Sequence, residues 1–331
     1  MQTSNPEPFI NAGLEAFALG SDELPQPLIG SRDLKHMLYR FFSFILTLGV
    51  AGCVVSGTDP ASFASKSAPP NYVRYLVPKG DHPFRYSRQG EPVRAGIVSE
   101  RYELRDGDCG GDDCVNPRFR TESVLKASAT QARFNQDIWY GWSFYNQNIQ
   151  SYPQSIALKN VFGQWKMGGF YPPHIKLVQI GRGEAYRGGN RSHDVVIQMD
   201  DANEAFGWGK SRNWGIVCRL FSIDEARGKW IDIVMNTNFG TDQNGYLRIW
   251  INGQQRCDYR GPIVAVTDTS RFPGPNHRRG IYVSSTKRWD ATQPSVKKPT
   301  QIAFYDEFRI GRSRSEVDIR LIEQAGLPPV D

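Results

Sequence analysis

Residues 246–252 (YLRIWIN) and 301–310 (QIAFYDEFRI) decide the fold class, because apolar and polar side chains alternate along them. In the first stretch Leu247, Ile249 and Ile251 share one face, as residues two apart do on a β-strand. In the second stretch the same spacing predicts one apolar face, made of Ile302, Phe304, Phe308 and Ile310. Both stretches therefore predict strands with one buried face.

Further runs of strand character occupy residues 139–145, 195–199 and 231–237. The chain also holds 32 glycines and 21 prolines, a supply that suits many turns between short strands. Asn252-Gly253 directly follows one strand and reads as a tight turn. Many strands with such punctuation predict an all-β sandwich of two antiparallel sheets, which we expect to occupy residues 71–331 as one domain.

The front of the chain reads as a targeting segment. In residues 37–53 (MLYRFFSFILTLGVAGC), Arg40 precedes an apolar run that is too short to span a bilayer and has signal-peptide length. The run ends in residues 50–53 (VAGC), which resemble the lipobox of bacterial lipoproteins, so we expect lipidation of Cys53. The alternative is ordinary signal cleavage with Cys53 incidental. Either predicts export, to the bacterial cell envelope (periplasm or outer membrane) or to the medium.

The segments on either side of this signal have no predicted role in the fold. We interpret residues 1–36 as a mis-assigned or disordered extension, because Met37 is the natural start of the signal. Residues 54–70 are small, polar and proline-containing, and we expect a flexible linker there.

Four cysteines remain besides Cys53, namely Cys109, Cys114, Cys218 and Cys257. An even number in an exported chain favours disulfides. The pairing expected is Cys109–Cys114 and Cys218–Cys257, out of three connectivities that four cysteines allow. A zinc site is the competing interpretation, but the sequence has no CxxC motif and no histidine beside these cysteines.

The formal net charge is +6, and a basic surface attracts polyanions. Nucleic acid is not expected as a partner, since the chain lacks a nucleic-acid-binding motif and is predicted to be exported. An anionic polysaccharide is the expected partner, and the chain is expected to be a monomer.

Three segments hold the residues most suited to chemistry: 118–122 (RFRTE), 164–166 (QWK) and 277–282 (HRRGIY). On strands, residues two apart share a face. The pattern therefore groups Arg118, Arg120 and Glu122, then Gln164 and Lys166, then Arg278, Gly280 and Tyr282.

These three segments resemble the strands of jelly-roll polysaccharide lyases, especially the heparin lyase I-like group and, more distantly, the alginate lyases. That family has an Arg-(Ser/Thr)-Glu strand, a Gln-x-His strand and a Lys-x-Gly-x-Tyr strand in this order. Other stretches add to the likeness, among them 104–114 (LRDGDCGGDDC) and 250–253 (WING). The resemblance spans residues 95–312 and implies a concanavalin- or lectin-like jelly roll that cuts a uronate-containing polysaccharide by β-elimination.

The resemblance also implies roles for individual residues. Arg120 and Gln164 are expected to neutralise the uronate carboxylate, and Tyr282 to act as base, acid or both. Arg278 and Lys166 are expected to lower the pKa of Tyr282, and Gly280 to let a sugar approach closely. The set expected to contact substrate is Arg118, Glu122, Arg278, His277, His174 and Trp165.

Two positions depart from the family pattern. Lys166 stands where the family has histidine, and Arg278 stands where it has lysine. Lysine can act as a base only when burial or a neighbouring cation lowers its pKa. Lys166 is therefore either such a base or a partner of the substrate carboxylate, with Tyr282 taking the proton; His174 or His277 are alternative bases.

Each role has a plainer alternative. Arg120 and Glu122 can form a structural ion pair, Gln164 can be a buried polar residue, and Lys166 can be an ordinary solvated lysine. No metal or cofactor is needed for β-elimination, but Asp106, Asp108, Asp112 and Asp113, or Asp306, are compatible with a structural calcium. The acidic loop that holds the first four is expected to lie away from a cleft that binds a polyanion. The competing functions are a non-catalytic carbohydrate-binding protein on the same scaffold and a glycoside hydrolase.

Overall fold

The computed structural model describes residues 71–116, 118–151, 158–167, 173–179, 194–199, 215–264, 274–284 and 286–331. The predicted signal segment, Cys53 and the linker lie outside these residues, so their assignment stays a prediction. Within the described ranges, no helix has both the length and the apolar character needed to cross a membrane.

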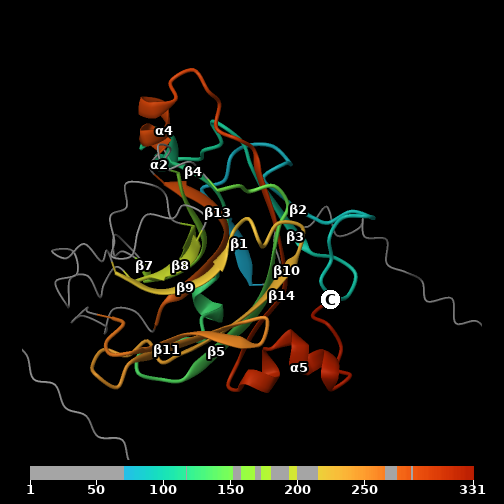
Figure 1. Ribbon diagram of the computed structural model, residues 1–331, viewed down its shortest axis with the longest axis vertical. Coiled ribbons are helices and arrows are strands. Elements are labelled where there is room, and N and C mark those ends of the chain that lie inside the picture. The colour runs from blue at the N-terminus through green and yellow to red at the C-terminus, as the bar shows by residue number, and fades with distance from the viewer. Residues whose placement is uncertain are drawn as a thin grey trace, which may run out of the picture. The chain divides into compact units, whose positions relative to one another are not determined.

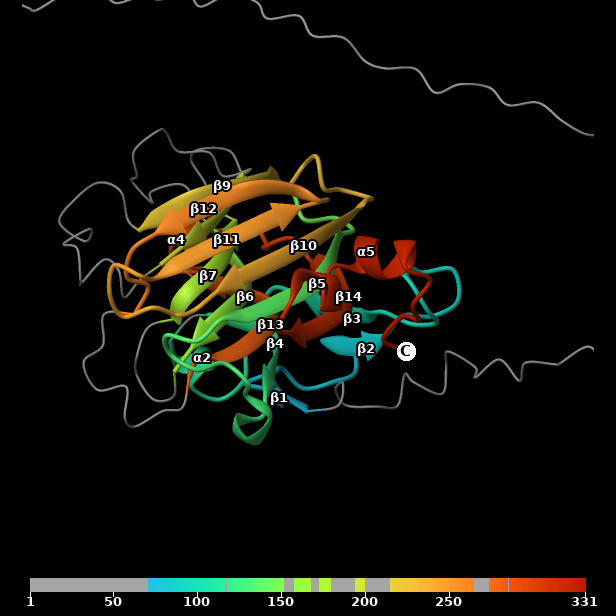
Figure 2. The same cartoon turned by 90° about the horizontal axis from the view of Figure 1, so that it is seen from below.

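The strands of the described residues form two antiparallel sheets, as predicted (Figures 1 and 2), and within these residues each sheet has seven strands. The first sheet has the order β1-β4-β13-β6-β7-β8-β9. Its strands are β1 (Tyr72–Tyr75), β4 (Phe119–Leu125), β13 (Asn276–Ser284), β6 (Lys159–Lys166), β7 (Pro173–Gln179), β8 (Asp194–Gln198) and β9 (Ile216–Ser222).

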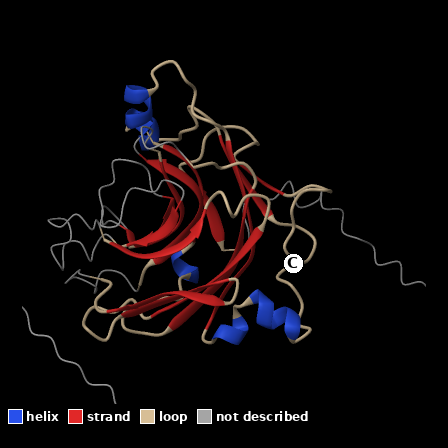
Figure 3. Cartoon of the chain, viewed as in Figure 1, coloured by secondary structure: helices blue, strands red, loops and turns tan. Residues whose placement is uncertain are grey.

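The second sheet has the order β12-β11-β10-β5-β14-β3-β2. Its strands are β12 (Gln254–Arg260), β11 (Tyr246–Ile251), β10 (Trp230–Thr237), β5 (Ile138–Asn146), β14 (Gln301–Gly311), β3 (Glu100–Leu104) and β2 (Phe84–Tyr86). In each sheet one late strand lies between two early ones: β13 lies between β4 and β6, and β14 lies between β5 and β3. Figure 3 shows how strongly strands dominate the described chain.

The helical elements are short. They are α2 (Asp112–Val115), η1 (Ala127–Ala129), α4 (Thr286–Thr292), η4 (Arg314–Glu316) and α5 (Ile319–Gln324). Of these, α4 and α5 lie outside the two sheets in Figure 1. The segment of η4 packs on β5 so closely that a Cβ at Gly141 would lie 1.8 Å from the Val317 carbonyl oxygen. A side chain at position 141 is therefore excluded.

The core between the sheets is rich in aromatic rings. Tyr102, Phe144 and Tyr305 from the second sheet and Phe162 and Trp165 from the first are buried there. Phe144 lies 5.0 Å from Phe162 and 5.5 Å from Tyr305, measured between ring centroids. Such contacts add directional packing to the burial of a large apolar area. They also fix which face of each first-sheet strand points outward.

The predicted alternation along β14 is wrong in part. Ala303 and Tyr305 face the core, and beyond them Phe308 and Ile310 also pack against it. The register shifts between Asp306 and Arg309, and Glu307 has a positive φ of 53°. A β-bulge here changes which face the following side chains point to, an interruption that simple alternation does not predict.

Both predicted disulfides are present. Cys109–Cys114 closes a small loop before β4, and Cys218–Cys257 joins β9 of the first sheet to β12 of the second. The competing zinc interpretation is therefore wrong. A cross-link between chain segments 39 residues apart restricts the unfolded chain and stabilises the sandwich by about 3 to 4 kcal/mol in the loop-entropy model.

Candidate active site

The three segments singled out in the sequence are neighbouring strands. β13 lies between β4 and β6 in the first sheet. Tyr282 is paired with Arg120 on one side, and Arg278 is paired with Gln164 on the other. The side chains between them, such as Ile281, point into the core, so Arg120, Gln164, Arg278 and Tyr282 project from the opposite, outer face. We call this the outer face of the first sheet.

The position of Tyr282 depends on a bulge in β13. The register with β6 shifts between Arg279 and Tyr282, and Gly280 within it has a φ of +133°. The Tyr305 hydroxyl, reaching across from the other sheet, lies 2.7 Å from the Gly280 carbonyl oxygen and 2.8 Å from that of Phe162 and donates to them. The second sheet thus fixes the bulge that sets Tyr282 on the outer face.

Gly280 has a different role from the predicted one. A Cβ at this position would lie 2.1 Å from the Thr121 carbonyl oxygen and 2.9 Å from the Cα of Glu122. The positive φ also disfavours any other residue. Close approach of β4 and the bulge require the glycine, so the expectation that it makes room for a sugar is wrong.

Glu122 is fully buried and joins the polar residues of the outer face. Its Oε2 accepts a hydrogen bond of 2.8 Å from Nη1 of Arg120, and its Oε1 accepts one of 2.6 Å from Nε2 of Gln164. Arg120 also donates from Nε and Nη2 to the two carboxylate oxygens of Asp113, at 2.6 and 3.2 Å. Two carboxylates therefore compensate the Arg120 charge, which leaves this residue little capacity to neutralise a substrate carboxylate.

Three other cations stand at the same face. Arg278 is half-buried, with its guanidinium carbon 4.4 Å from the centroid of the Tyr75 ring. Its Nε is buried without a hydrogen-bond partner among the described residues. Lys166 is half-buried and Arg118 is exposed. These residues can present positive charge to an anionic ligand, whereas Arg120 stacks its guanidinium carbon 4.2 Å from the centroid of the Tyr282 ring.

Burial moves the pKa values of the two candidate proton carriers in opposite directions. Burial, aided by the charges of Arg278 and Arg120, lowers the pKa of Lys166 below its ordinary value. Burial raises the pKa of Tyr282, and the charges of Arg118 and Arg120 offset this only in part. The expectation that neighbouring cations lower the pKa of Tyr282 overall is therefore wrong. The charges of Arg118, Arg120 and Glu122 act on both residues, which places Lys166 and Tyr282 in one electrostatic environment.

Trp165 and His277 do not lie at this face. Trp165 is fully buried in the core, 4.8 Å from the His277 ring by centroid. His277 stacks on Phe308 at 4.6 Å, and its Nδ1 lies 2.9 Å from the Tyr72 hydroxyl. Burial holds the pKa of His277 well below its ordinary value, so the ring is neutral. The prediction that these two residues contact substrate is wrong, because both point inward from their strands.

His174 is also fully buried, with its ring 6.2 Å from that of Phe134 in an edge-on arrangement. A substrate at the surface would not reach it in this position. The predictions that it binds substrate or serves as the base are therefore not supported by its place in the fold.

The acidic loop lies against the site rather than away from it. Asp113 binds Arg120, while Asp108 lies 2.9 Å from His82 and Asp106 lies 3.4 Å from Lys298. Asp306 accepts hydrogen bonds from the backbone N–H groups of Arg94 and Glu307. In the described ranges, no group of three or more His, Cys, Asp or Glu side chains is arranged to hold a metal ion. The structural calcium stays a prediction without an assigned site.

Sequence reasoning missed two residues of this face, Tyr75 and Asp113. Tyr75 is paired with Glu122, and its ring lies under Arg278 and 5.2 Å from the guanidinium carbon of Arg120. The alternation in residues 72–75 (YVRY) was a usable signal for a strand with one outward tyrosine. For Asp113 the signal was the disulfide loop directly before the Arg-Thr-Glu strand.

The family model described as "Polysaccharide lyase" matches residues 77–309, well over half of the chain. The chain belongs to the polysaccharide lyase family. It is a lyase with a jelly-roll fold, and the interpretation as a non-catalytic carbohydrate-binding protein is not favoured. No curated protein matches the lyase.

Several solved structures are similar to the lyase. A glucuronan lyase from the fungus Trichoderma reesei is 15% identical, covers 74% of this chain and 92% of its own, and has a TM-score of 0.48. An alginate lyase of polysaccharide lyase family 7 is 10% identical, with 76% and 97% covered and a TM-score of 0.44. A family 131 glycoside hydrolase domain from Coprinopsis cinerea is 12% identical, with 80% and 93% covered and a TM-score of 0.46. The assignment to the family rests on the sequence match.

Proposed function

We propose that the lyase cleaves a uronate-containing anionic polysaccharide by β-elimination at the outer face of the first sheet, with Lys166 as base and Tyr282 as acid. The observation that carries the proposal is the strand register, which brings Tyr282 beside Arg120 and Arg278 beside Gln164 on one face. These residue types suit the removal of a weakly acidic proton next to a carboxylate.

The substrate carboxylate has to be neutralised before the C5 proton can leave. Arg278 suits this task, because it is half-buried on the outer face, where it lies over the Tyr75 ring and is paired with Gln164. A charged donor placed where negative charge develops stabilises the enolate-like intermediate. Arg120 and Gln164 instead hold Glu122, so in this proposal they shape the site and contribute less to the carboxylate.

The opposite pKa shifts assign the proton transfers. With ordinary values of 10.5 for Lys166 and 10.0 for Tyr282, the lysine would still be protonated at a pH where the tyrosine has begun to lose its proton. The lowered pKa of Lys166 and the raised pKa of Tyr282 work against this order. They favour a form with a neutral lysine and a protonated tyrosine, and environments that push two pKa values apart identify a base and an acid.

In the reaction the neutral Lys166 amine accepts the C5 proton, and the C5–H electrons form the C4–C5 double bond as the C4–O bond breaks. Tyr282 donates its proton to the departing glycosidic oxygen. The products are an unsaturated uronate end and a new sugar end, with no water consumed. Activity should rise as the pH passes the pKa of Lys166 and fall as it passes the pKa of Tyr282.

The test is incubation with alginate, glucuronan, heparin and bacterial uronate-containing exopolysaccharides, followed by ultraviolet absorbance of the unsaturated product. Each polymer is paired with its carboxyl-reduced form, which lacks the uronate carboxylates. We expect product from at least one acidic polymer and none from its reduced form. Binding of an acidic polymer without product from any of them would refute the proposal.

Three finer assignments belong to the same proposal. The motif order supports a place near the heparin lyase I-like group, and the disulfides agree with export. Residues 50–53 support a lipid anchor at Cys53, which radiolabelled palmitate incorporation, lost in Cys53→Ser, would test. We further propose that the lyase acts as a monomer, which its mass in dilute solution would test.

A further inference from the structure

The loop closed by Cys109–Cys114 packs closely against the chain segment that contains Val77. A Cβ at Gly110 would lie 2.5 Å from the Val77 carbonyl oxygen, and Gly111 has a φ of +52°. The two glycines therefore permit close contact with the preceding segment and the turn into α2. The disulfide joins Cys109, directly before the two glycines, to Cys114 in α2, the helix that also contains Asp113.

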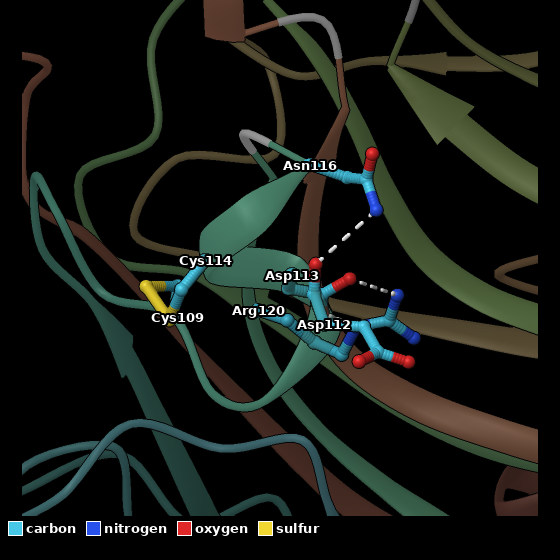
Figure 4. The surroundings of a disulfide bond; sticks show 6 residues. All are labelled: Cys109, Asp112, Asp113, Cys114, Asn116 and Arg120. Atoms are coloured by element: carbon cyan, nitrogen blue, oxygen red, sulfur yellow. Dashed lines mark hydrogen bonds and ion pairs between the residues drawn. A yellow bond between two sulfur atoms is a disulfide. The ribbon is translucent and has the colours of Figure 1, made fainter.

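This loop and the residue before it hold the start of β4 through two backbone hydrogen bonds and one side-chain ion pair. The backbone N–H of Arg118 donates to the Asp113 carbonyl oxygen at 3.2 Å, and that of Arg120 donates to the Asp108 carbonyl oxygen at 3.2 Å. The Asp113 carboxylate accepts the two side-chain hydrogen bonds from Arg120. Figure 4 shows Asp113 between the Cys109–Cys114 bridge and the Arg120 guanidinium. Both arginines whose charges act most strongly on Tyr282 are thus attached to one disulfide-closed loop.

Asp113 is buried, as are Arg120, which it binds, and Glu122, which shares that arginine. Asp113 is 3% exposed, Arg120 is 6% exposed and Glu122 is fully buried. A buried guanidinium paired on two sides has little freedom to move, because breaking one pair leaves an uncompensated charge. Arg120 in turn has its guanidinium carbon over the ring of Tyr282, 4.2 Å from the centroid. A continuous series of contacts therefore connects the disulfide to Tyr282, the proposed acid, through Asp113 and Arg120.

We propose that Asp113, held by the Cys109–Cys114 loop, is a positioning residue that fixes Arg120 against Tyr282 and sets the charge around the tyrosine hydroxyl. This inference rests on the proposed β-elimination and adds a residue to it. Asp113 touches no reacting atom; it acts through Arg120. Because Cys114 is exposed and Cys109 is half-buried, a chemical reductant can reach the disulfide that closes this loop.

The decisive variants are Asp113→Asn and Asp113→Glu, assayed for kcat, KM and the pH dependence of kcat on the polymer that the wild type cleaves. In Asp113→Asn we expect kcat to fall by about a hundredfold, the loss typical of a misplaced catalytic arrangement, while KM changes by less than about threefold. The negative charge of Asp113 raises the pKa of Tyr282, so its removal should move the alkaline limb of the profile to lower pH. Asp113→Glu keeps the charge and should restore part of kcat and the position of that limb.

Asp112→Asn is the matched control, because Asp112 is an exposed carboxylate on the same helix. It should leave kcat and the alkaline limb unchanged. Cys109→Ser with Cys114→Ser opens the loop without changing its charge, and we expect kcat to fall by about tenfold or more with the limb unmoved. Cys218→Ser with Cys257→Ser removes the other bridge, and we expect the melting temperature to fall with kcat retained below it.

The inference is overturned if the wild type cleaves polymer and Asp113→Asn retains kcat and the alkaline limb. If Asp113→Asn does not fold, by circular dichroism, then the opened-loop variant decides: full kcat in that variant overturns the inference. A wild type that cleaves none of the polymers refutes the proposed function itself, and the inference with it.

Discussion

Replacing Lys166 with arginine separates the role of a proton acceptor from that of a positive charge. Arginine keeps the charge but stays protonated at any pH the protein tolerates, so it cannot accept the C5 proton. Lys166 is half-buried near Arg278 and Arg120, which is why its pKa is lowered and its neutral form becomes accessible. A general base contributes about 10²- to 10⁴-fold to a rate. We therefore expect Lys166→Arg to lower kcat/KM by at least about a hundredfold, which corresponds to about 2.7 kcal/mol of transition-state stabilisation.

The assay is the initial rate of unsaturated product formation over a pH series from mildly acidic to strongly alkaline. The wild-type rate should rise tenfold for each pH unit below the pKa of Lys166, and Lys166→Arg should lack this rise. Lys166→His is the companion variant: it supplies the base that the family usually has, and its rise should begin at lower pH, because imidazole has an ordinary pKa of about 6.5. If Lys166→Arg keeps at least about half the activity and the same rise with pH, the residue only pairs with the substrate carboxylate.

Three further predictions concern the support of the site. Tyr305→Phe removes the hydroxyl that bonds the Gly280 and Phe162 carbonyl groups, so it should lower the free energy of unfolding by about 1 to 3 kcal/mol and reduce kcat; an unchanged denaturation midpoint would speak against this. Gly280→Ala should destabilise by about 3 kcal/mol or more, from its positive φ and the 2.1 Å approach to Thr121, measured by the same denaturation; a wild-type midpoint would mean that the bulge relaxes. Because the pKa of buried His277 is lowered, the unfolded chain binds the proton first, so wild-type stability should fall as the pH drops below about 6.5. His277→Phe should lose this contribution, and equal pH slopes for the two proteins would contradict it.

The fold followed from local pattern wherever the strands are regular. The alternation in β11 placed Leu247, Ile249 and Ile251 in the core, as predicted. In β14 the pattern misled, because the bulge at Glu307 puts Phe308 and Ile310 on the core face together with Ala303 and Tyr305. Ile302 and Phe304, predicted to share that face, lie on the other side of the strand. A bulge depends on the partner strand as much as on its own residues, so a single strand's sequence does not reveal it.

The sequence predicted which residues make up the candidate site better than it predicted the ion pairs between them. The two-residue spacing correctly put Arg120, Tyr282 and Gln164 on one outward face. The ion pair between Arg120 and Glu122, stated as the plainer alternative, is present, and Arg120 also binds Asp113, which the spacing did not predict. Ion pairs between a loop and a strand are set by tertiary packing, which the sequence pattern does not contain. The acidic loop was expected to lie elsewhere because its charge would repel a polyanion, but Arg120 compensates the charge of Asp113.

His277 is a residue that the sequence wrongly grouped with the site. It adjoins Arg278 in sequence and was grouped with the site for that reason. On a strand, adjacent residues face opposite ways, and its neutral ring belongs to the core stack with Phe308. Alternation applied to residues 277–282 as strictly as to residues 246–252 would have placed it inside.

The most direct test of the account is the mass of the oligosaccharides that the wild type releases from a uronate polymer in water enriched in oxygen-18. Elimination consumes no water, so each new unsaturated end should be lighter than a hydrolytic end by one water molecule, and no product should carry the heavy isotope from bond cleavage. The same products should be absent with Tyr282→Phe. Saturated ends that carry one solvent oxygen would contradict the account, since they would show hydrolysis at this site.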